Sequence, residues 1–155
     1  MTPSELKKLL AEAEQDPKRL AAAVSGVPET ILRTKPAPDK WCMQEIVGHL
    51  ADSELVFAYR FRQVLADKEP KFAPIDQDAW AAHLGYLEAS VPELVAQFGL
   101  ERHHNLRLLR RVQVADLTKS GFHPERNKQV ALEEMIRYWV AHGPNHLAQI
   151  EKLKK

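Results

Sequence analysis

The stretch "VALEEMIRYWVAHGPNHLAQIEKL" (residues 130–153) has the spacing of a long amphipathic helix and carries two histidines one helical turn apart. Its apolar residues recur every three or four positions: Leu132, Met135, Ile136, Trp139, Leu147, Ile150 and Leu153. Because residues four apart share a helix face, His142 and His146 are expected on the same inward side. Gly143 and Pro144 stand between them, although glycine costs roughly 1 kcal/mol and proline about 3 kcal/mol inside a helix. The stretch predicts a buried helix whose backbone hydrogen bonding is disturbed beside its two histidines.

Pro144 has no N–H group, so the carbonyl of Val140 loses its helical donor. We expect a kink here that sets the angle between the two imidazoles. The alternative is a local bulge that the helix merely tolerates.

Three further amphipathic segments precede this helix. They run from about Ser4, as the N-cap, to Gly26 with a restart at Pro17, from about Met43 to Asp67, and from about Ser90 to Val112. Residues 27–40, 68–77 and 120–128 are rich in turn residues and predict connections, with a short helix over 78–84. No segment alternates with period two, so no β structure is expected. The sequence therefore predicts an all-α protein, a four-helix bundle with short extra helices in its connections, as one domain over residues 1–155.

Composition excludes several classes of function. The chain has 155 residues, of which 45% are apolar and 28% charged, and its formal net charge is +1. This balance gives no support for a nucleic-acid partner. Cys42 is the one cysteine, which excludes an intramolecular disulfide framework. The charged N-terminus lacks a signal-peptide core and no apolar run is long enough to span a membrane, so we expect a cytoplasmic protein with no membrane partner.

His49 interrupts the apolar face of the second long segment, between Ile46 and Leu50. An ion held by His142 and His146 would need a third ligand from a facing helix, and its remaining positions would stay open to water or substrate. Spacing alone does not select that ligand, and four other histidines stay open: His83, His103, His104 and His123. The charged surroundings of residues 103 and 104 indicate solvent exposure, whereas residues 83 and 123 lie near loops where they could line a pocket mouth. The alternative is a set of hydrogen-bonded core histidines without metal.

Three segments together resemble the DinB-like superfamily, closest to its branch of metal-dependent hydrolases and bacillithiol S-transferases. They are "KWCMQEIVGHLADSE" (40–54), "PIDQDAW" (74–80) and "AHGPNHLAQIEKL" (141–153). The family pattern matches at Trp41, Cys42, Glu45, His49, Leu50, Glu54, His142 and His146. The resemblance extends from about Ile31 to the last helix, and the N-terminal segment takes the place of the first helix.

The resemblance implies a fold and a chemistry. It implies an up-down-down-up bundle, frequent homodimers, and a divalent metal (nickel, zinc or iron) on His49, His142 and His146. The implied function is a metal-dependent enzyme, a hydrolase or thiol S-transferase, that acts on a small-molecule substrate, with a low-molecular-weight thiol as the cosubstrate of the transfer reaction. The reacting group would then be metal-bound water or thiolate, and no catalytic side chain is identified. The alternative function is a catalytically silent, metal-stabilised stress-related or binding protein.

Polar residues near these histidines are candidates for supporting roles. Glu45 and Asp52 flank His49 by about one helical turn, and either could hold an imidazole N–H. Gln149 follows His146 by three residues and could lie near the same site.

Two polar residues interrupt the third long helix. Arg102 and Asn105 would either face the pocket and bind an anionic substrate or lie on a solvated helix edge. Cys42 stands where the family has serine or threonine. We interpret it as a weak helix cap rather than a nucleophile, because no base adjoins it in the sequence.

Overall fold

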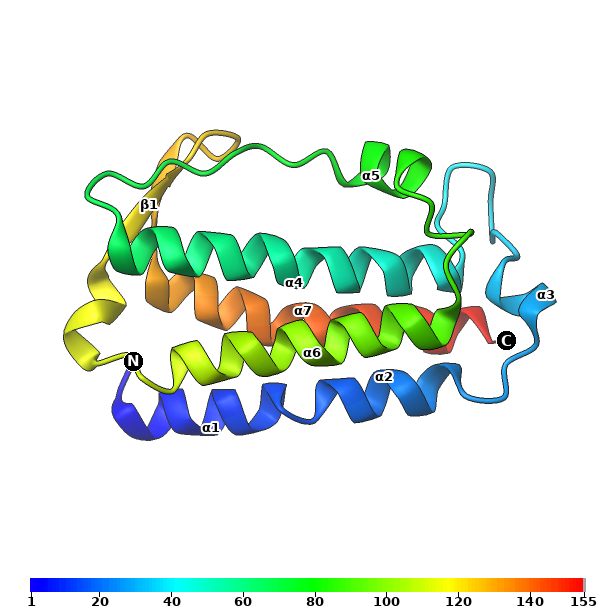
Figure 1. Cartoon of the computed structure of the whole chain (residues 1–155), viewed down its shortest axis with the longest axis horizontal. Coiled ribbons are helices and arrows are strands. Elements are labelled where there is room, and N and C mark those ends of the chain that lie inside the picture. Colours follow the sequence, from blue (N-terminus) through cyan, green and yellow to red (C-terminus); the bar gives the residue numbers. More distant parts are fainter. Residues whose placement is uncertain (155) are drawn as a thin grey trace.

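Four helical rods form the molecule in the computed structural model, which describes residues 1–154 (Figure 1). The first rod is α1 (Pro3–Ala13) followed end to end by α2 (Asp16–Val24), and the others are α4 (Met43–Ala66), α6 (Val91–Leu109) and α7 (Leu132–Leu153). The first rod and α7 run one way along the bundle, while α4 and α6 run the other way (Figure 1). The predicted all-α bundle and its up-down-down-up order are confirmed. Within residues 1–154, no helix combines the length and apolar character needed to span a membrane.

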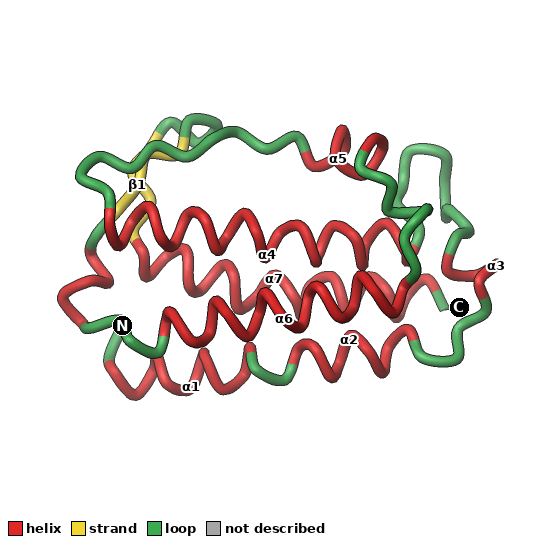
Figure 2. Tube along the Cα trace, in the orientation of Figure 1, coloured by secondary structure: helices red, strands yellow, loops and turns green. Residues whose placement is uncertain are grey.

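The connections explain why α4 and α6 are parallel. After α4 the chain crosses back along the outside of the bundle through residues 67–90, which include α5 (Gln77–His83), and only then enters α6 (Figure 2). The one-turn helix α3 (Glu29–Leu32) lies within the connection from α2 to α4, which the sequence predicted as a loop. A 3₁₀ turn, η1 (Val114–Thr118), follows α6.

The prediction of no β structure was wrong. Strands β1 (Ser120–His123) and β2 (Lys128–Ala131) form an antiparallel hairpin between η1 and α7. Strands of four residues are too short for a period-two pattern to show in the sequence. The crossing segment is joined to this hairpin, because Phe72 N–H donates to the Phe122 carbonyl (2.9 Å) and Phe122 N–H donates to the Pro70 carbonyl (2.8 Å).

Helix caps set the starts of the rods. Thr2, and not Ser4 as predicted, caps α1: its hydroxyl accepts the Glu5 N–H while the Glu5 carboxylate accepts the Thr2 N–H. Proline then occupies the first helical position, where its fixed φ suits the helix. Cys42 is the N-cap residue of α4 as predicted, and the Glu45 carboxylate accepts its N–H at 2.8 Å.

The interior has two apolar clusters with a polar layer between them. One cluster adjoins the hairpin and includes Leu10, Phe61, Leu109, Ile136 and Trp139, and the other adjoins α3 and includes Leu20, Ile46, Leu50, Phe98 and Ile150. Buried polar side chains lie at the intervening level of the rods: Asp16, Glu54, Arg102 and Asn105. Because buried polar groups need partners, this layer fixes how the four rods align.

Candidate metal centre

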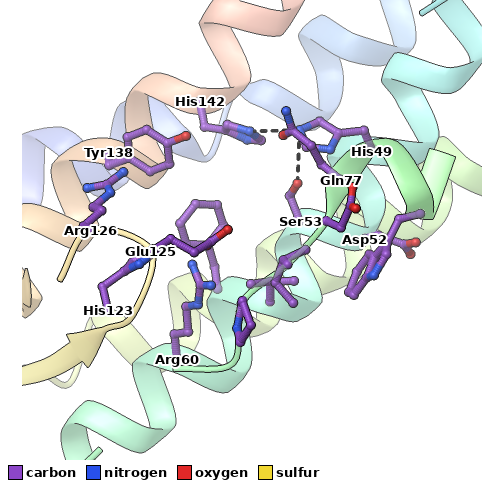
Figure 3. A pocket seen from close by; sticks show the side chains of 16 residues that line it. His49, Asp52, Ser53, Arg60, Gln77, His123, Glu125, Arg126, Tyr138 and His142 are labelled. Carbon is purple, nitrogen blue, oxygen red and sulfur yellow. Dashed lines mark hydrogen bonds between the residues drawn. The ribbon is translucent and has the colours of Figure 1, made fainter. Parts of the chain in front are cut away.

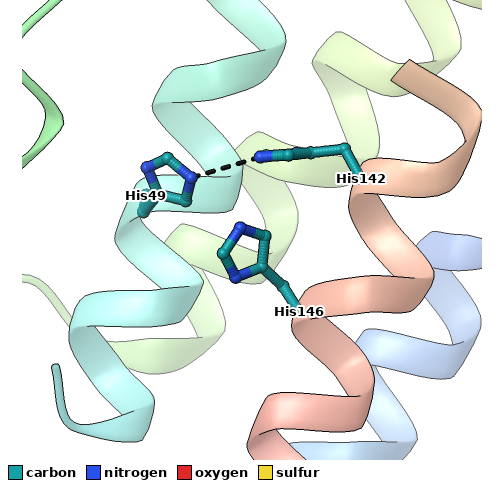
Figure 4. A group of neighbouring side chains, drawn as sticks. All are labelled: His49, His142 and His146. Carbon is teal, nitrogen blue, oxygen red and sulfur yellow. Dashed lines mark hydrogen bonds between the residues drawn. The ribbon is translucent and has the colours of Figure 1, made fainter. Parts of the chain in front are cut away.

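Three histidines from two rods converge near the middle of the bundle. His49 lies on α4, whereas His142 and His146 lie one turn apart on α7 (Figure 4). One ring nitrogen of each lies within 4.8 Å of those of the other two, and His49 Nε2 is 3.2 Å from His142 Nε2. His49 and His142 are each only 8% exposed. Of the alternatives left open by the sequence, the structure brings only His49 to the α7 pair.

The separation of the His49 and His142 nitrogens fits two ligands of a shared ion. Two imidazole nitrogens at about 2.0–2.1 Å from one ion are about 2.9 Å apart at a right angle and about 3.3–3.4 Å apart in a tetrahedron. The observed 3.2 Å lies between these values. A hydrogen bond between two neutral imidazoles would give the same distance, but the approach of His146 to both rings favours an ion.

The protonation state suits metal binding. Burial lowers the pKa of His49 from 6.5 to about 4 and the pKa of His142 to about 2, and the neighbouring His146 adds to both effects. Burial also lowers the pKa of His146, against the opposing effect of its hydrogen bond to Gln149 Oε1. All three imidazoles are therefore neutral near pH 7, the form that coordinates metals.

Neighbouring side chains fix the orientation of two of the rings. The Trp41 ring packs on His49, with ring centroids 4.7 Å apart. Gln149 Oε1 lies 3.0 Å from His146 Nδ1, so an N–H at Nδ1 can donate to it and Nε2 keeps its lone pair. His142 differs, because its Nδ1 is buried and has no hydrogen-bond partner within residues 1–154.

Neither carboxylate predicted to hold a histidine N–H contacts one. Glu45 accepts the Cys42 N–H and pairs with Lys35 Nζ at 2.9 Å, so it serves the start of α4. Asp52 lines the floor of a neighbouring cavity, and it accepts from Tyr86 Oη at 2.8 Å and from Gln97 Nε2 at 3.2 Å. Both carboxylates lie about one helical turn from His49. Their partners Lys35, Tyr86 and Gln97, however, come from other segments of the chain and hold them away from the imidazole.

Cys42 is a buried cap. Its side chain is fully buried, and burial raises the pKa of the thiol. A buried thiol kept protonated is a poor nucleophile, which agrees with its interpretation as a cap.

Arg102 and Asn105 lie neither in the cavity wall nor on a solvated edge, so both predicted placements were wrong. Arg102 is fully buried, with Nη1 3.1 Å from Asp16 Oδ2 and Nη2 2.8 Å from Glu54 Oε1. Asn105 Nδ2 donates to Glu54 Oε2 at 2.9 Å, and Trp139 Nε1 donates to the same carboxylate. These contacts join all four rods.

This charged layer explains the glycine in the opening stretch. A Cβ at Gly143 would lie 2.6 Å from Asp16 Oδ2 and 3.5 Å from Arg102 Nη2. A side chain there would collide with the buried ion pair, so glycine lets that pair approach the α7 backbone. The helix continues through Pro144 without interruption from Leu132 to Leu153. The effect of Pro144 on the imidazole angle stays a prediction.

A cavity of about 690 Å³ opens beside the histidines (Figure 3). One face of α4 forms its floor through His49, Asp52, Ser53, Val56, Phe57 and Arg60. The crossing segment, the hairpin tip and α7 form the walls through residues 74–77, Trp80, His123, Glu125, Arg126, Tyr138 and His142. Its volume is in the range of small-molecule sites.

Several cavity residues were missed from the sequence. Ser53 and Arg60 lie four and eleven residues after His49, so helical spacing could have identified them. Tyr138 precedes His142 by four residues on α7, so the same spacing could have identified it. Nothing local to Arg126 placed it there, because the hairpin reaches the cavity only in the folded chain. His123 also lines the cavity, whereas His83 and His103 are exposed and His104 is half-buried.

Fold and site together define a four-helix bundle with a crossed connection and a three-histidine cluster beside a cavity. The model of the DinB superfamily matches residues 12–150, and the chain belongs to that superfamily. A relative from Bacillus mycoides is 28% identical over 152 residues, which cover 97% of this chain and 86% of the relative. YfiT from Bacillus subtilis is 28% identical over 149 residues, which cover 96% and 83%. Both relatives are provisionally named metal-dependent hydrolases.

The solved structure of YfiT has the same architecture. It superposes with a TM-score of 0.94 at 25% sequence identity, covering 99% of this chain and 88% of YfiT. That protein is described as "a probable metal-dependent hydrolase with an unusual four-helix bundle topology". The parallel arrangement of α4 and α6 is the feature that departs from an alternating bundle.

Proposed function

We propose that this protein is a metal-dependent enzyme that acts on a small molecule as a hydrolase or thiol S-transferase. Its divalent ion would be held by His49, His142 and His146. The observation that carries the proposal is the convergence of three neutral imidazoles within 4.8 Å beside a cavity of about 690 Å³. The provisional names of the relatives support the same class of activity.

The donor set indicates which chemistry the site can supply. Three imidazoles suit zinc, nickel and iron, and all three are neutral, so they do not offset the charge of the ion. A divalent ion bound there would act as a Lewis acid that lowers the pKa of a water or thiol at the open positions. Hydrolysis and thiol transfer both use a nucleophile made at neutral pH in this way.

The side chains around the cluster bind and orient the substrate in this proposal. Ser53 Oγ lies 3.4 Å from His49 Nε2 on the cavity side, where its hydroxyl can hydrogen-bond a reacting group. Both oxygens of Asp52 already accept hydrogen bonds, so that carboxylate orients Tyr86 rather than removing a proton. Ile75 and Trp80 of the crossing segment line the cavity with apolar surface that would contact an apolar part of the substrate.

Elemental analysis of protein purified without a histidine tag tests the site. The wild type is compared with the double variant His142→Ala/His146→Ala and with a control, His103→Ala/His104→Ala, which removes two adjacent histidines from α6. We expect about one metal per chain in the wild type and the control and none in the α7 variant. Wild-type protein that is purified without metal and does not bind added nickel, zinc or iron would refute the proposal. The three histidines would then be hydrogen-bonded core residues.

Turnover separates the enzyme from a silent metal protein. The metal-loaded protein is assayed for hydrolysis and for conjugation of thiols to electrophiles, with the α7 double variant as the blank. Full metal content without either activity would favour the metal-stabilised binding protein. The homodimer also remains a proposal from the family resemblance, and light scattering tests it.

A further inference from the structure

The cavity has two chemically different ends. The histidine cluster lies at one end, and Arg60, His123 and Arg126 lie together at the other (Figure 3). His49 and Arg60 line the same face of α4 eleven residues apart, which is about 16 Å along a helix. A molecule that touches both ends must therefore be elongated.

Arg60 is a half-buried cation without a carboxylate at ion-pair distance within residues 1–154. Its Nη2 donates to the Ala73 carbonyl at 3.0 Å, and its Cζ lies 5.2 Å from the centroid of the Phe72 ring. These contacts fix the guanidinium without neutralising it. Burial lowers the pKa of Arg60, but a guanidinium stays charged near neutral pH.

The hairpin brings a second cation and a buried imidazole to the same place. Arg126 Nη1 lies 3.5 Å from Glu134 Oε1, but Lys128 Nζ binds the same oxygen at 2.8 Å, so two cations share one carboxylate. His123 is 9% exposed, and its Nδ1 is buried without a hydrogen-bond partner in the described chain. Glu125, exposed at the hairpin tip, and Glu134, already shared by Arg126 and Lys128, are the acidic residues facing this end within residues 1–154. The balance of charge around Arg60 and Arg126 is positive.

We infer that Arg60, Arg126 and His123 form an anion-binding subsite. It would receive a carboxylate or phosphate group on the substrate, at the end remote from the group that reacts at the histidines. Guanidinium groups bind both kinds of oxyanion through paired N–H donors, and a neutral imidazole can add one more hydrogen bond. The substrate class is an elongated, terminally anionic small molecule. This placement relative to the reacting group rests on the proposed function, whereas the anion site itself does not.

Anion binding to the metal-free protein tests the subsite by itself. Inorganic phosphate and glutarate are titrated calorimetrically into chelator-treated wild type, Arg60→Gln and Arg126→Gln. The control is Arg62→Gln, which removes the same charge two residues further along α4 from an exposed position outside the cavity. Since a hydrogen bond to a charged group contributes about 1.5–3 kcal/mol, each cavity variant should bind at least about tenfold more weakly while the control is unchanged.

The outcomes distinguish this inference from the proposed function. No binding by the wild type, or equal binding by all four proteins, would refute the subsite. The same loss in Arg62→Gln as in Arg60→Gln would also refute it, because that result indicates general surface charge. Metal binding without anion binding would leave only the proposed function standing, and anion binding without metal binding would leave only the subsite.

A matched pair of thiols tests where the anionic group lies. Binding of 11-mercaptoundecanoate and 11-mercaptoundecanol, whose extended chains approach the separation of the two ends, to the nickel-loaded protein is followed by thiolate-to-nickel absorption. We expect the acid to bind about tenfold more tightly in the wild type and to lose that advantage in Arg60→Gln. Equal affinities of the acid and the alcohol for the wild type would refute the proposed position of the charge.

Discussion

Replacing Gly143 by alanine has two opposite effects on the free energy of unfolding, a gain in helix propensity and a steric overlap with Asp16. Alanine favours a helix over glycine by about 1 kcal/mol, so propensity alone predicts a more stable protein. The added Cβ, however, would lie 2.6 Å from Asp16 Oδ2 and 3.1 Å from Asp16 Cγ. Ordinary contact requires the carboxylate to move by roughly 1 Å, away from its position 3.1 Å from Arg102 Nη1.

The buried ion pair between Asp16 and Arg102 determines whether Gly143→Ala raises or lowers the free energy of unfolding. Asp16 is 1% exposed and Arg102 is fully buried, so neither side chain can move into solvent. Overpacking of a core costs about 1–3 kcal/mol, and weakening a buried ion pair adds to that cost. After subtraction of the gain in helix propensity, overpacking alone leaves about 0–2 kcal/mol. With about 1 kcal/mol more for the weakened ion pair, we expect Gly143→Ala to lower the free energy of unfolding by about 1–3 kcal/mol.

Urea unfolding of the metal-free protein measures this change, with Gly99→Ala as the matched control. Gly99 lies inside α6, where a Cβ would meet only Pro17 Cβ at an ordinary 3.6 Å. We expect Gly99→Ala to raise the free energy of unfolding by about 0.5–1 kcal/mol. If Gly143→Ala stabilised the protein as much as Gly99→Ala, the assignment of Gly143 to the space beside Asp16 would be wrong.

Three further predictions concern the histidines and the charged layer. Nickel, zinc or iron at about 100 times its dissociation constant should stabilise the wild type by about 2.7 kcal/mol, seen as a thermal shift absent from His142→Ala/His146→Ala. The pKa values of His49 and His142 are lower in the folded state than the ordinary 6.5, so the unfolded chain takes up protons first. Metal-free stability should therefore be complete above pH 6.5 and fall towards pH 4, by at most about 1.4 kcal/mol per pH unit for each histidine; a flat urea-midpoint profile contradicts this. Glu54→Gln should lower the free energy of unfolding by about 3 kcal/mol, because Arg102 loses one carboxylate, and unchanged stability would count against that ion pair.

Short-range spacing was sufficient to predict the helices and part of the site. Apolar residues at three- and four-residue intervals predicted the long helices, and four-residue spacing alone placed His142 and His146 on one face. The N-cap at Cys42 depends on Glu45 three residues later, which is also a local relation. The hairpin was missed because its strands are shorter than the pattern that would reveal them.

Contacts between segments far apart in the sequence determined the remaining features of the site, namely the partners of His142 and of Arg102. His49 lies 93 residues from His142, and Asp16 lies 86 residues from Arg102, so no spacing rule could select these partners. Arg102 had the sequence context of a pocket or surface residue, yet the packing of four rods buries it against two carboxylates.

The sequence by itself determined that four amphipathic helices form and that two histidines share a face, because both follow from the helical repeat. The family resemblance named His49 as the third histidine, and only the tertiary structure showed that it faces that pair. Only the tertiary structure likewise decided why Gly143 has no side chain and which charges line the far end of the cavity. These features depend on how separate helices pack, and packing depends on the close fit and the partnered charges of the whole interior.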